Sequence, residues 1–180
     1  YKQMSAWAET ISPGANGLLF LPYLAGERTP HMDASASGMF FGLRLHHERN
    51  HLVRAVMEGV GFALKSCLTL IGTDASHMLL SGGASESTVW SQILADILNV
   101  PLAITTPAPY GSLGSAIMAG VGAGTYQSTD DALSYLTQPE TVIHPIPANV
   151  ALYQQYDDQY QQLYPLLKDH MRRLMKIEFE

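Results

Sequence analysis

The sequence predicts an α/β fold, because short apolar runs that suit buried strands alternate with segments that have the apolar spacing of helices. Three runs have the character of buried strands: 17–24, 77–81 and 102–105. Longer segments repeat apolar residues every three or four positions: 47–71, 89–98, 111–123 and 130–136. Three strands are few for this much apolar helix surface. We therefore expect further strands before Tyr1 and interpret the 180 residues as part of a longer protein.

The predicted helices differ in the residues that they place on their packing faces. The helix over 47–71 carries a stripe of small residues beside its apolar stripe, namely Ala55, Gly59 and Ala63. Small residues let two backbones approach, so this helix is expected to pack closely on a sheet or on another helix. The helix over 111–123 is equally rich in small residues, and Gly124 is its predicted C-cap.

The chain closes with a tyrosine-rich helical tail over 148–176. Tyr and Leu recur there every three or four positions, which favours a core-facing stripe over a surface for docking a partner. Asn149 is the candidate N-cap of this helix. Pro165 lies inside it and is expected to kink or restart it.

Composition excludes several classes of function. Hydrophobic residues make up 47% of the chain and charged residues 14%, which suits a buried core. The net charge of −6 supplies no basic stripe for nucleic acid, and no apolar run is long enough to span a membrane. A single cysteine, Cys67, fits a reducing compartment such as the cytoplasm. His47 and His51 lack a third ligand nearby, so no metal site is predicted.

The segment 79–96 is the most informative part of the chain. A short apolar run ends in Gly82-Gly83-Ala84, and a helix pattern begins at once. Glycines allow a backbone to approach a ligand closely, and the first N–H groups of a helix are unpaired donors. Ser85 and Ser87 are candidate caps for that helix. A nucleotide could lie here, but an ordinary tight turn between strand and helix fits the same residues.

Four carboxylates are candidates for chemistry, and each also has a structural interpretation. Glu27 and Asp33 lie in an irregular segment directly after a buried strand, where functional loops often lie. Glu27 could instead pair with Arg28, and Asp33 could make an Asx turn. Glu58 fits a hydrogen-bonded position within a helix, and Asp96 fits a structural bond to the loop that follows it.

Four motifs occur in the order in which one protein family carries them. They are 21–33 (LPYLAGERTPHMD); Gly38-x-Phe40-x-Gly42-Leu43 followed after seven residues by His51-Leu52-x-x-Ala55-Val56-Met57-Glu58; the Gly82-Gly83 turn with Ser87, Trp90, Gln92 and Asp96; and Gly111-Ser112-Leu113-Gly114-Ser115-Ala116-Ile117. Together they resemble the C-terminal half of the FGGY carbohydrate kinases, most closely the xylulokinase-like members. Ala84 stands where a third glycine is common, and Ser112 and Ser115 stand where alanine is common.

The resemblance implies one domain over 1–180, with a motif-bearing core at 17–126 and the helical tail at 148–176. The implied fold is ribonuclease H-like, that of the actin/hexokinase/Hsp70 ATPases, as the C-terminal half of a two-domain kinase. ATP and Mg²⁺ are the implied cofactors. A small sugar or polyol is the implied substrate, most readily D-xylulose converted to xylulose 5-phosphate. A homodimer is compatible with the resemblance.

The resemblance also assigns roles to residues. Gly82, Gly83, Ala84 and Ser87 would contact the adenosine, and Gly26, Glu27, Arg28 and Thr29 would lie nearer the phosphates. The general base would lie earlier in the protein, before Tyr1. No catalytic residue is therefore expected within these 180 residues, which alone would be inactive. Two alternatives remain open: another FGGY kinase, acting on glycerol, gluconate or ribulose, and a non-catalytic protein of the same fold that senses nucleotide or sugar.

Overall fold

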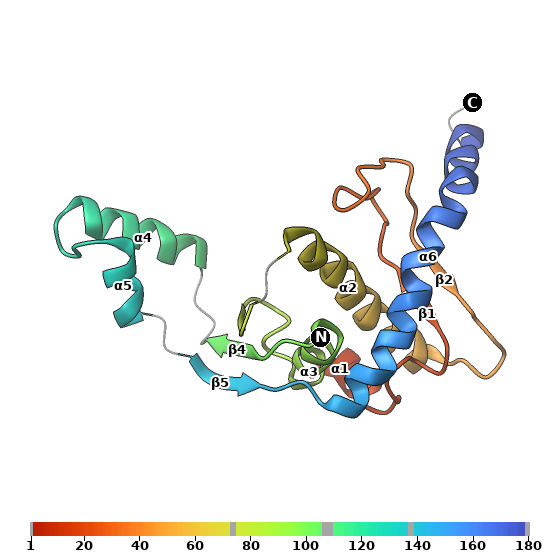
Figure 1. The fold of residues 1–180 in the computed structure, drawn as a ribbon, viewed down its shortest axis with the longest axis horizontal. Coiled ribbons are helices and arrows are strands. Elements are labelled where there is room, and N and C mark those ends of the chain that lie inside the picture. The colour runs from red at the N-terminus through yellow and green to blue at the C-terminus, as the bar shows by residue number, and fades with distance from the viewer. Residues whose placement is uncertain (1, 73–74, 106–109, 137–138, 179–180) are drawn as a thin grey trace.

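The computed structural model describes residues 2–72, 75–105, 110–136 and 139–178 (Figure 1). Its elements, in chain order, are α1 (Lys2–Glu9), β1 (Leu19–Leu21), β2 (Met39–Phe41), α2 (Arg49–Ile71), β3 (Met78–Leu80), α3 (Thr88–Leu98), β4 (Leu102–Thr105), α4 (Tyr110–Gly122), α5 (Thr129–Leu136), β5 (Pro139–Ile143) and α6 (Pro147–Glu178). Strands and helices alternate through the middle of the chain, which confirms the predicted α/β class.

The strands form two small sheets. In the first, β1 and β2 pair antiparallel with Leu19 opposite Phe41. In the second, with strand order β3-β4-β5, Met78 lies opposite Leu102 in a parallel pair and Leu102 lies opposite Ile143 in an antiparallel pair. The sequence did not predict β2 or β5. The residues of β2 are at least partly exposed, and β5 begins with a proline and a glutamate, so neither has the apolar character of a buried strand.

The long helix α2 has defined ends. Its N-terminus carries a capping box in which Glu48 and His51 exchange side-chain and backbone hydrogen bonds. At its C-terminus, Gly72 takes a left-handed conformation and donates its N–H to the Leu68 carbonyl. The predicted close packing is confirmed at Gly59, where a Cβ would collide with the carbonyl oxygen of Phe20 in β1.

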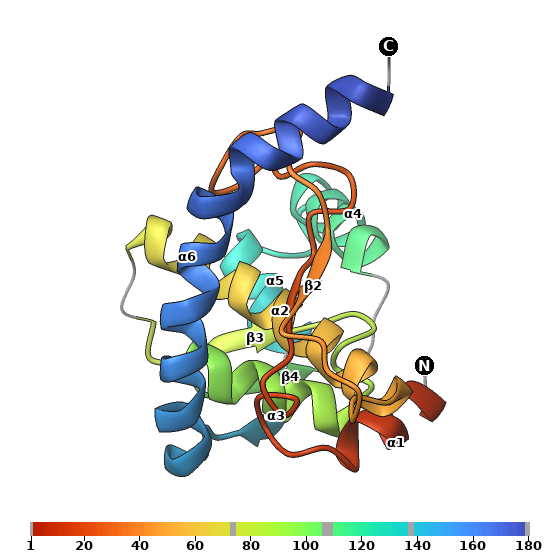
Figure 2. The same cartoon turned by 90° about the vertical axis from the view of Figure 1, so that its right-hand side faces the viewer.

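The core lies where α2, α3 and β1 meet α6, which runs across α2 in both views (Figures 1 and 2). Tyr153 and Tyr160 of α6 are buried and pack on Phe62 of α2, with ring centroids 6.0 and 5.2 Å away. These contacts confirm that the tyrosine stripe faces the core. α6 is one helix through Pro165, so the expected restart does not occur.

The start of α6 also differs from the prediction. The helix begins at Pro147, a residue whose fixed φ and missing N–H suit the first helical position. Asn149 therefore lies inside the first turn and is not the N-cap; its side-chain amide instead donates to Asp96 of α3.

The helices α4 and α5 pack on each other and stand apart from α6 in Figure 1. Gly124 follows α4 in a left-handed conformation, with φ of 73°, as expected of a C-cap glycine. The predicted proline-rich turn at 107–110 falls largely outside the described residues. Within the parts of the chain that are described, no helix is long and apolar enough to cross a membrane.

Candidate functional site

The turn between β3 and α3 is open to solvent. Gly82 has φ of 78°, and its carbonyl accepts hydrogen bonds from the N–H and the hydroxyl of Ser85, at 3.0 and 2.7 Å. Both Gly82 and Gly83 are exposed, and a Cβ on either would meet no atom within 4 Å. A ligand can therefore reach this backbone without displacing a side chain.

Ser87 is the N-cap of α3, as predicted. Its Oγ accepts the N–H of Trp90 at 3.2 Å, which satisfies one of the unpaired donors of the first turn. The same Oγ lies 2.7 Å from the Oγ of Ser5 in α1. When Ser5 is the donor of that bond, the hydroxyl hydrogen of Ser87 stays available to another acceptor.

The second predicted segment, Gly26 to Thr29, is a closed loop. The backbones of Glu27 and Asp33 exchange two hydrogen bonds, of 2.9 and 2.8 Å. Gly26 has φ of 77°, and a Cβ there would lie 2.9 Å from the Cα of Ala34. The Glu27 carboxylate accepts the N–H of Thr29 at 2.8 Å. Glu27 therefore braces its own loop, and the exposed Arg28 side chain is left to face solvent.

Asp33 makes the Asx turn that the sequence allowed, with its Oδ1 accepting the N–H of Ser35 at 2.9 Å. Its Oδ2 accepts the hydroxyl of Tyr164 at 2.7 Å and the guanidinium of Arg172 at 2.8 and 3.1 Å. The Tyr164 hydroxyl, the Ser35 N–H and Arg172 together lower the pKa of Asp33. Its carboxylate is committed to the protein and is not available as a general base.

The turn and the loop border different cavities: Glu27 and Arg28 border one of about 260 Å³, and Ser87 borders one of about 320 Å³. The Thr29 carbonyl accepts the thiol of Cys67 at 3.4 Å, and Cys67 borders an apolar groove of about 270 Å³. Leu80, two residues before Gly82, borders the same groove. The groove is thus bordered by a residue of α2 that contacts the loop and by a strand, β3, that leads into the turn.

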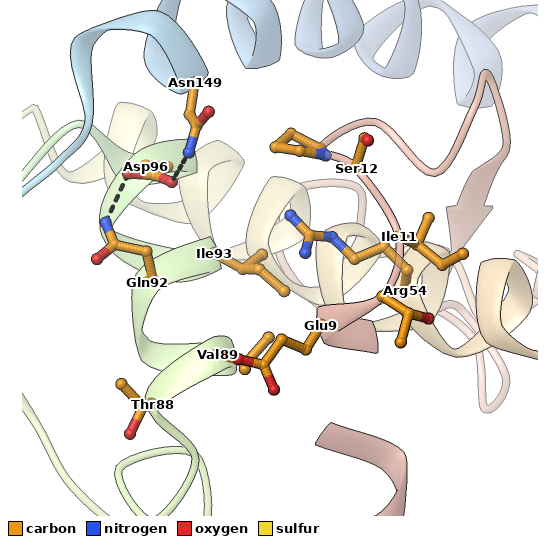
Figure 3. Close-up of a pocket in the computed structure, with 12 residues that line it drawn as sticks. Glu9, Ile11, Ser12, Arg54, Thr88, Val89, Gln92, Ile93, Asp96 and Asn149 are labelled. Carbon is orange, nitrogen blue, oxygen red and sulfur yellow. Dashed lines mark hydrogen bonds between the residues drawn. The ribbon is translucent and has the colours of Figure 1, made fainter. Parts of the chain in front are cut away.

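Two polar residues of the third motif lie on another face of α3. Gln92 and Asp96 border a cavity of about 460 Å³ next to the end of α1 (Figure 3). Asp96 accepts hydrogen bonds from the Gln92 side chain and the Ile146 N–H, both at 2.8 Å, and from Asn149 at 2.7 Å. Asp96 therefore has the structural role that was expected, but the expected partner was wrong. Its bonds outside α3 go to the start of α6 and not to the loop that directly follows α3.

The hydrogen-bonded position expected for Glu58 is confirmed, but the sequence analysis missed the buried charged cluster to which Glu58 belongs. Arg54 and Glu58 of α2 form an ion pair of 2.7 Å with side-chain exposures of 8% and 2%. Glu58 Oε1 also accepts the hydroxyl of Tyr153 at 2.7 Å and the N–H of Gly14 at 2.9 Å. Burial raises the pKa of Glu58, and Arg54 opposes that rise. The i,i+4 spacing of the pair was its only signal in the sequence.

The histidines bind the backbone. His47 Nδ1 accepts the N–H of Arg44 at 2.9 Å, and His51 Nδ1 accepts the N–H of Glu48 at 3.1 Å. Across residues 2–72, 75–105, 110–136 and 139–178, no three His, Cys, Asp or Glu side chains come together as a metal site. Mg²⁺ that binds together with a nucleotide is held mainly by phosphate oxygens and one or two carboxylates, so it needs no such cluster.

Comparisons with known proteins identify the family. Residues 1–123 match the model of the C-terminal domain of the FGGY family of carbohydrate kinases. The chain is 33% identical over 172 residues to the xylulose kinase of Bacillus subtilis, covering 94% of the chain and 34% of that protein. It is 35% identical over 137 residues to the gluconokinase of Bacillus licheniformis, covering 72% of the chain and 26% of that protein.

Solved structures give the same result. The ligand-bound xylulose kinase of Lactobacillus acidophilus superposes with a TM-score of 0.87 at 30% identity, over 96% of this chain and 36% of that one. This chain belongs to the FGGY family of carbohydrate kinases and has the fold of the actin/hexokinase/Hsp70 ATPases. It spans about a third of the length of the xylulose kinase relatives it matches.

Proposed function

We propose that this chain is the nucleotide-binding half of a kinase that transfers the γ-phosphoryl group of ATP to a sugar, with D-xylulose as the acceptor. The observation that carries the proposal is the open glycine turn at the start of α3, in a chain that belongs to the FGGY family. The xylulose kinases among the relatives favour D-xylulose, because they match over more of this chain than the gluconokinase does.

In this proposal the adenosine lies against Gly82, Gly83 and Ala84. The two glycines have no side chain that could obstruct it, and the space around them is open. The N–H groups at the start of α3 then supply donors, and Ser87 adds its hydroxyl hydrogen when Ser5 bonds to it. Mg²⁺ bound together with ATP would supply positive charge that offsets the negative charge of the phosphates.

Phosphoryl transfer depends on positioning the phosphates and stabilising the charge that moves. The exposed Arg28, held on the closed loop of Gly26 to Thr29, is the candidate for the second role. Each of the carboxylates of Glu27, Asp33, Glu58 and Asp96 accepts a hydrogen bond from the protein, and the free oxygen of Glu58 is buried, so we propose that the general base comes from the remainder of a longer kinase. These 180 residues alone would then bind nucleotide without turning it over.

Nucleotide binding is tested by calorimetric titration of Mg·ADP into the chain and into Gly83→Val. The valine should abolish binding while leaving the unfolding midpoint unchanged, because a side chain at Gly83 meets nothing in the protein. Gly122→Val is the matched control, since Gly122 at the end of α4 is equally open. Equal binding by parent and Gly83→Val would place the nucleotide elsewhere.

The acceptor is tested in a full-length protein containing this chain, by ADP release with D-xylulose, D-ribulose, gluconate and glycerol. The proposal expects the highest kcat/KM with D-xylulose. A preference for gluconate would make the second candidate correct, which the gluconokinase relative already supports. Nucleotide binding without turnover of any sugar would favour a sensing protein. Sugar-dependent turnover by the pure 180-residue chain would refute the placement of the base outside it.

A further inference from the structure

The loop that carries Arg28 is held in place by the far end of the chain. In both views the segment between β1 and β2 lies beside the C-terminal half of α6 (Figures 1 and 2). The link is Asp33, which is buried and accepts hydrogen bonds from Tyr164 and Arg172 through one carboxylate oxygen. Residues more than 130 positions apart thereby fix one loop.

Asp33 passes this constraint directly to the predicted phosphate side of the loop. Its backbone N–H and carbonyl pair with Glu27 in both directions, and Met32 donates its N–H to the Arg28 carbonyl at 3.2 Å. Glu27 in turn accepts the N–H of Thr29. Movement of Asp33 therefore moves the backbone that presents Arg28.

Aromatic packing supports the same contact. The His31 ring stacks on Tyr164 with centroids 3.8 Å apart and planes 14° apart. Tyr23, at the end of the segment that enters the loop, meets Tyr164 edge-on at 6.0 Å. Tyr160, one turn earlier in α6, donates its hydroxyl to Tyr23 at 3.3 Å. Two successive turns of α6 therefore contact the segment that contains the loop.

We propose that Asp33, Tyr164 and Arg172 are positioning residues. They set the conformation of the Gly26–Thr29 loop and, through that loop, the binding of ATP. The proposal rests on the proposed kinase function, and none of the three residues is assigned contact with substrate. Arg172 is the informative member, because its side chain is half exposed and bonds Asp33 with two nitrogens. A two-nitrogen contact fixes orientation as well as charge.

The test compares Arg172→Ala with Arg173→Ala in the full-length protein. Arg173 is the matched control because it is exposed and bonds only to the Asp169 carbonyl of its own helix among the described residues. Hydrogen exchange of the peptide covering residues 24–36 should become severalfold faster in Arg172→Ala and stay unchanged in Arg173→Ala. Tyr164→Phe keeps the ring on His31 and loses one hydrogen bond, so its exchange should rise less.

The kinetic readout separates positioning from a general loss of folded enzyme. Arg172→Ala should raise KM for ATP severalfold with KM for the sugar unchanged, and Arg172→Lys should recover part of the loss because it restores charge with one donor group. Unchanged exchange in Arg172→Ala overturns the inference, whatever the kinetics. A lower kcat with KM for ATP unchanged also overturns it, because this is the result of fewer active molecules. Absence of turnover by the wild-type protein overturns the proposed function and is seen before any variant is compared.

Discussion

The hydroxyl of Tyr153 is the best single atom with which to test the buried cluster. It donates to Glu58 at 2.7 Å and accepts from Arg54 at 2.6 Å, and the tyrosine is fully buried. Burial raises the pKa of Tyr153, so the hydroxyl stays protonated and remains a donor. Tyr153→Phe removes this oxygen and keeps the ring that packs on Phe62.

The expected loss follows from what each partner retains. Glu58 Oε1 keeps the Arg54 Nε and the Gly14 N–H, so it stays bonded. The second terminal nitrogen of Arg54 loses its partner inside the protein. A hydrogen bond to a charged group contributes about 1.5–3 kcal/mol, and an unsatisfied buried donor costs about 1–3 kcal/mol. These two energies partly describe the same loss, so they are not added in full. We expect Tyr153→Phe to lower the free energy of unfolding by about 2–4 kcal/mol.

Urea unfolding followed by circular dichroism measures this loss. The matched control is Tyr126→Phe, because Tyr126 is only partly buried and its ring lies beside Gly120, away from the buried cluster; its effect should stay within about 0.5 kcal/mol. Glu58→Gln leaves Arg54 buried without its counter-charge and should cost about 3–5 kcal/mol, whereas replacing Arg54 by Met and Glu58 by Leu together should cost much less.

A loss of less than about 1 kcal/mol in the free energy of unfolding of Tyr153→Phe would refute the reasoning, because removing a hydroxyl that bridges two buried charged groups should destabilise the protein by more than that. The same conclusion follows if the Tyr126→Phe control loses as much, since the effect would then come from removing any tyrosine hydroxyl and not from the buried pair.

Three further predictions concern the loop, the core and the helix contact. The lowered pKa of Asp33 means that its contribution to stability is fully present above the ordinary aspartate pKa of about 3.9 and is lost as pH falls through the folded pKa; acid titration of unfolding should show this, and Asp33→Asn should remove it. Ile97→Ala should cost about 2–5 kcal/mol in urea unfolding, because Ile97 is buried beneath α2. Gly59→Ala should lower the melting temperature more than Gly122→Ala, because only the first would drive a methyl group into the Phe20 carbonyl.

Local patterns were enough to predict the helices from α2 onward, but not α1 (Lys2–Glu9). The apolar spacing placed α2, α3 and α4 within two residues of their observed bounds, and Ser87 and Gly124 were found as end signals. These features depend on residues a few positions apart, which periodicity and capping chemistry detect directly. The strands β2 and β5 were not predicted, because they are stabilised by pairing with β1 and β4. These partner strands lie too far along the chain to be seen in a short stretch of sequence.

The candidate turn was equally accessible to sequence reasoning, because two glycines between a strand and a helix are a local signal. The residues that hold the rest of the site were not. Asp33 is 139 positions from Arg172, and Glu58 is 95 positions from Tyr153. An isolated Asp in a loop and an isolated Glu in a helix each fit several roles, and only the fold supplies the partner that selects one.

These long-range partners have one element in common, because both come from α6. Its first half fixes the buried ion pair of α2 through Tyr153, and its second half fixes the loop of Arg28 through Tyr164 and Arg172. The match to the family model ends at residue 123, before this helix, yet α6 bears on both the stability of the core and the geometry of the proposed phosphate side. If the two halves of α6 act independently, Tyr153→Phe should speed exchange in residues 24–36 only to the extent that it unfolds the whole chain, whereas Arg172→Ala should do so without global unfolding. Hydrogen exchange is therefore compared between that peptide and α3 in the two variants. Faster exchange in both segments indicates a residue that stabilises the core, and faster exchange in residues 24–36 alone indicates a residue that stabilises the loop.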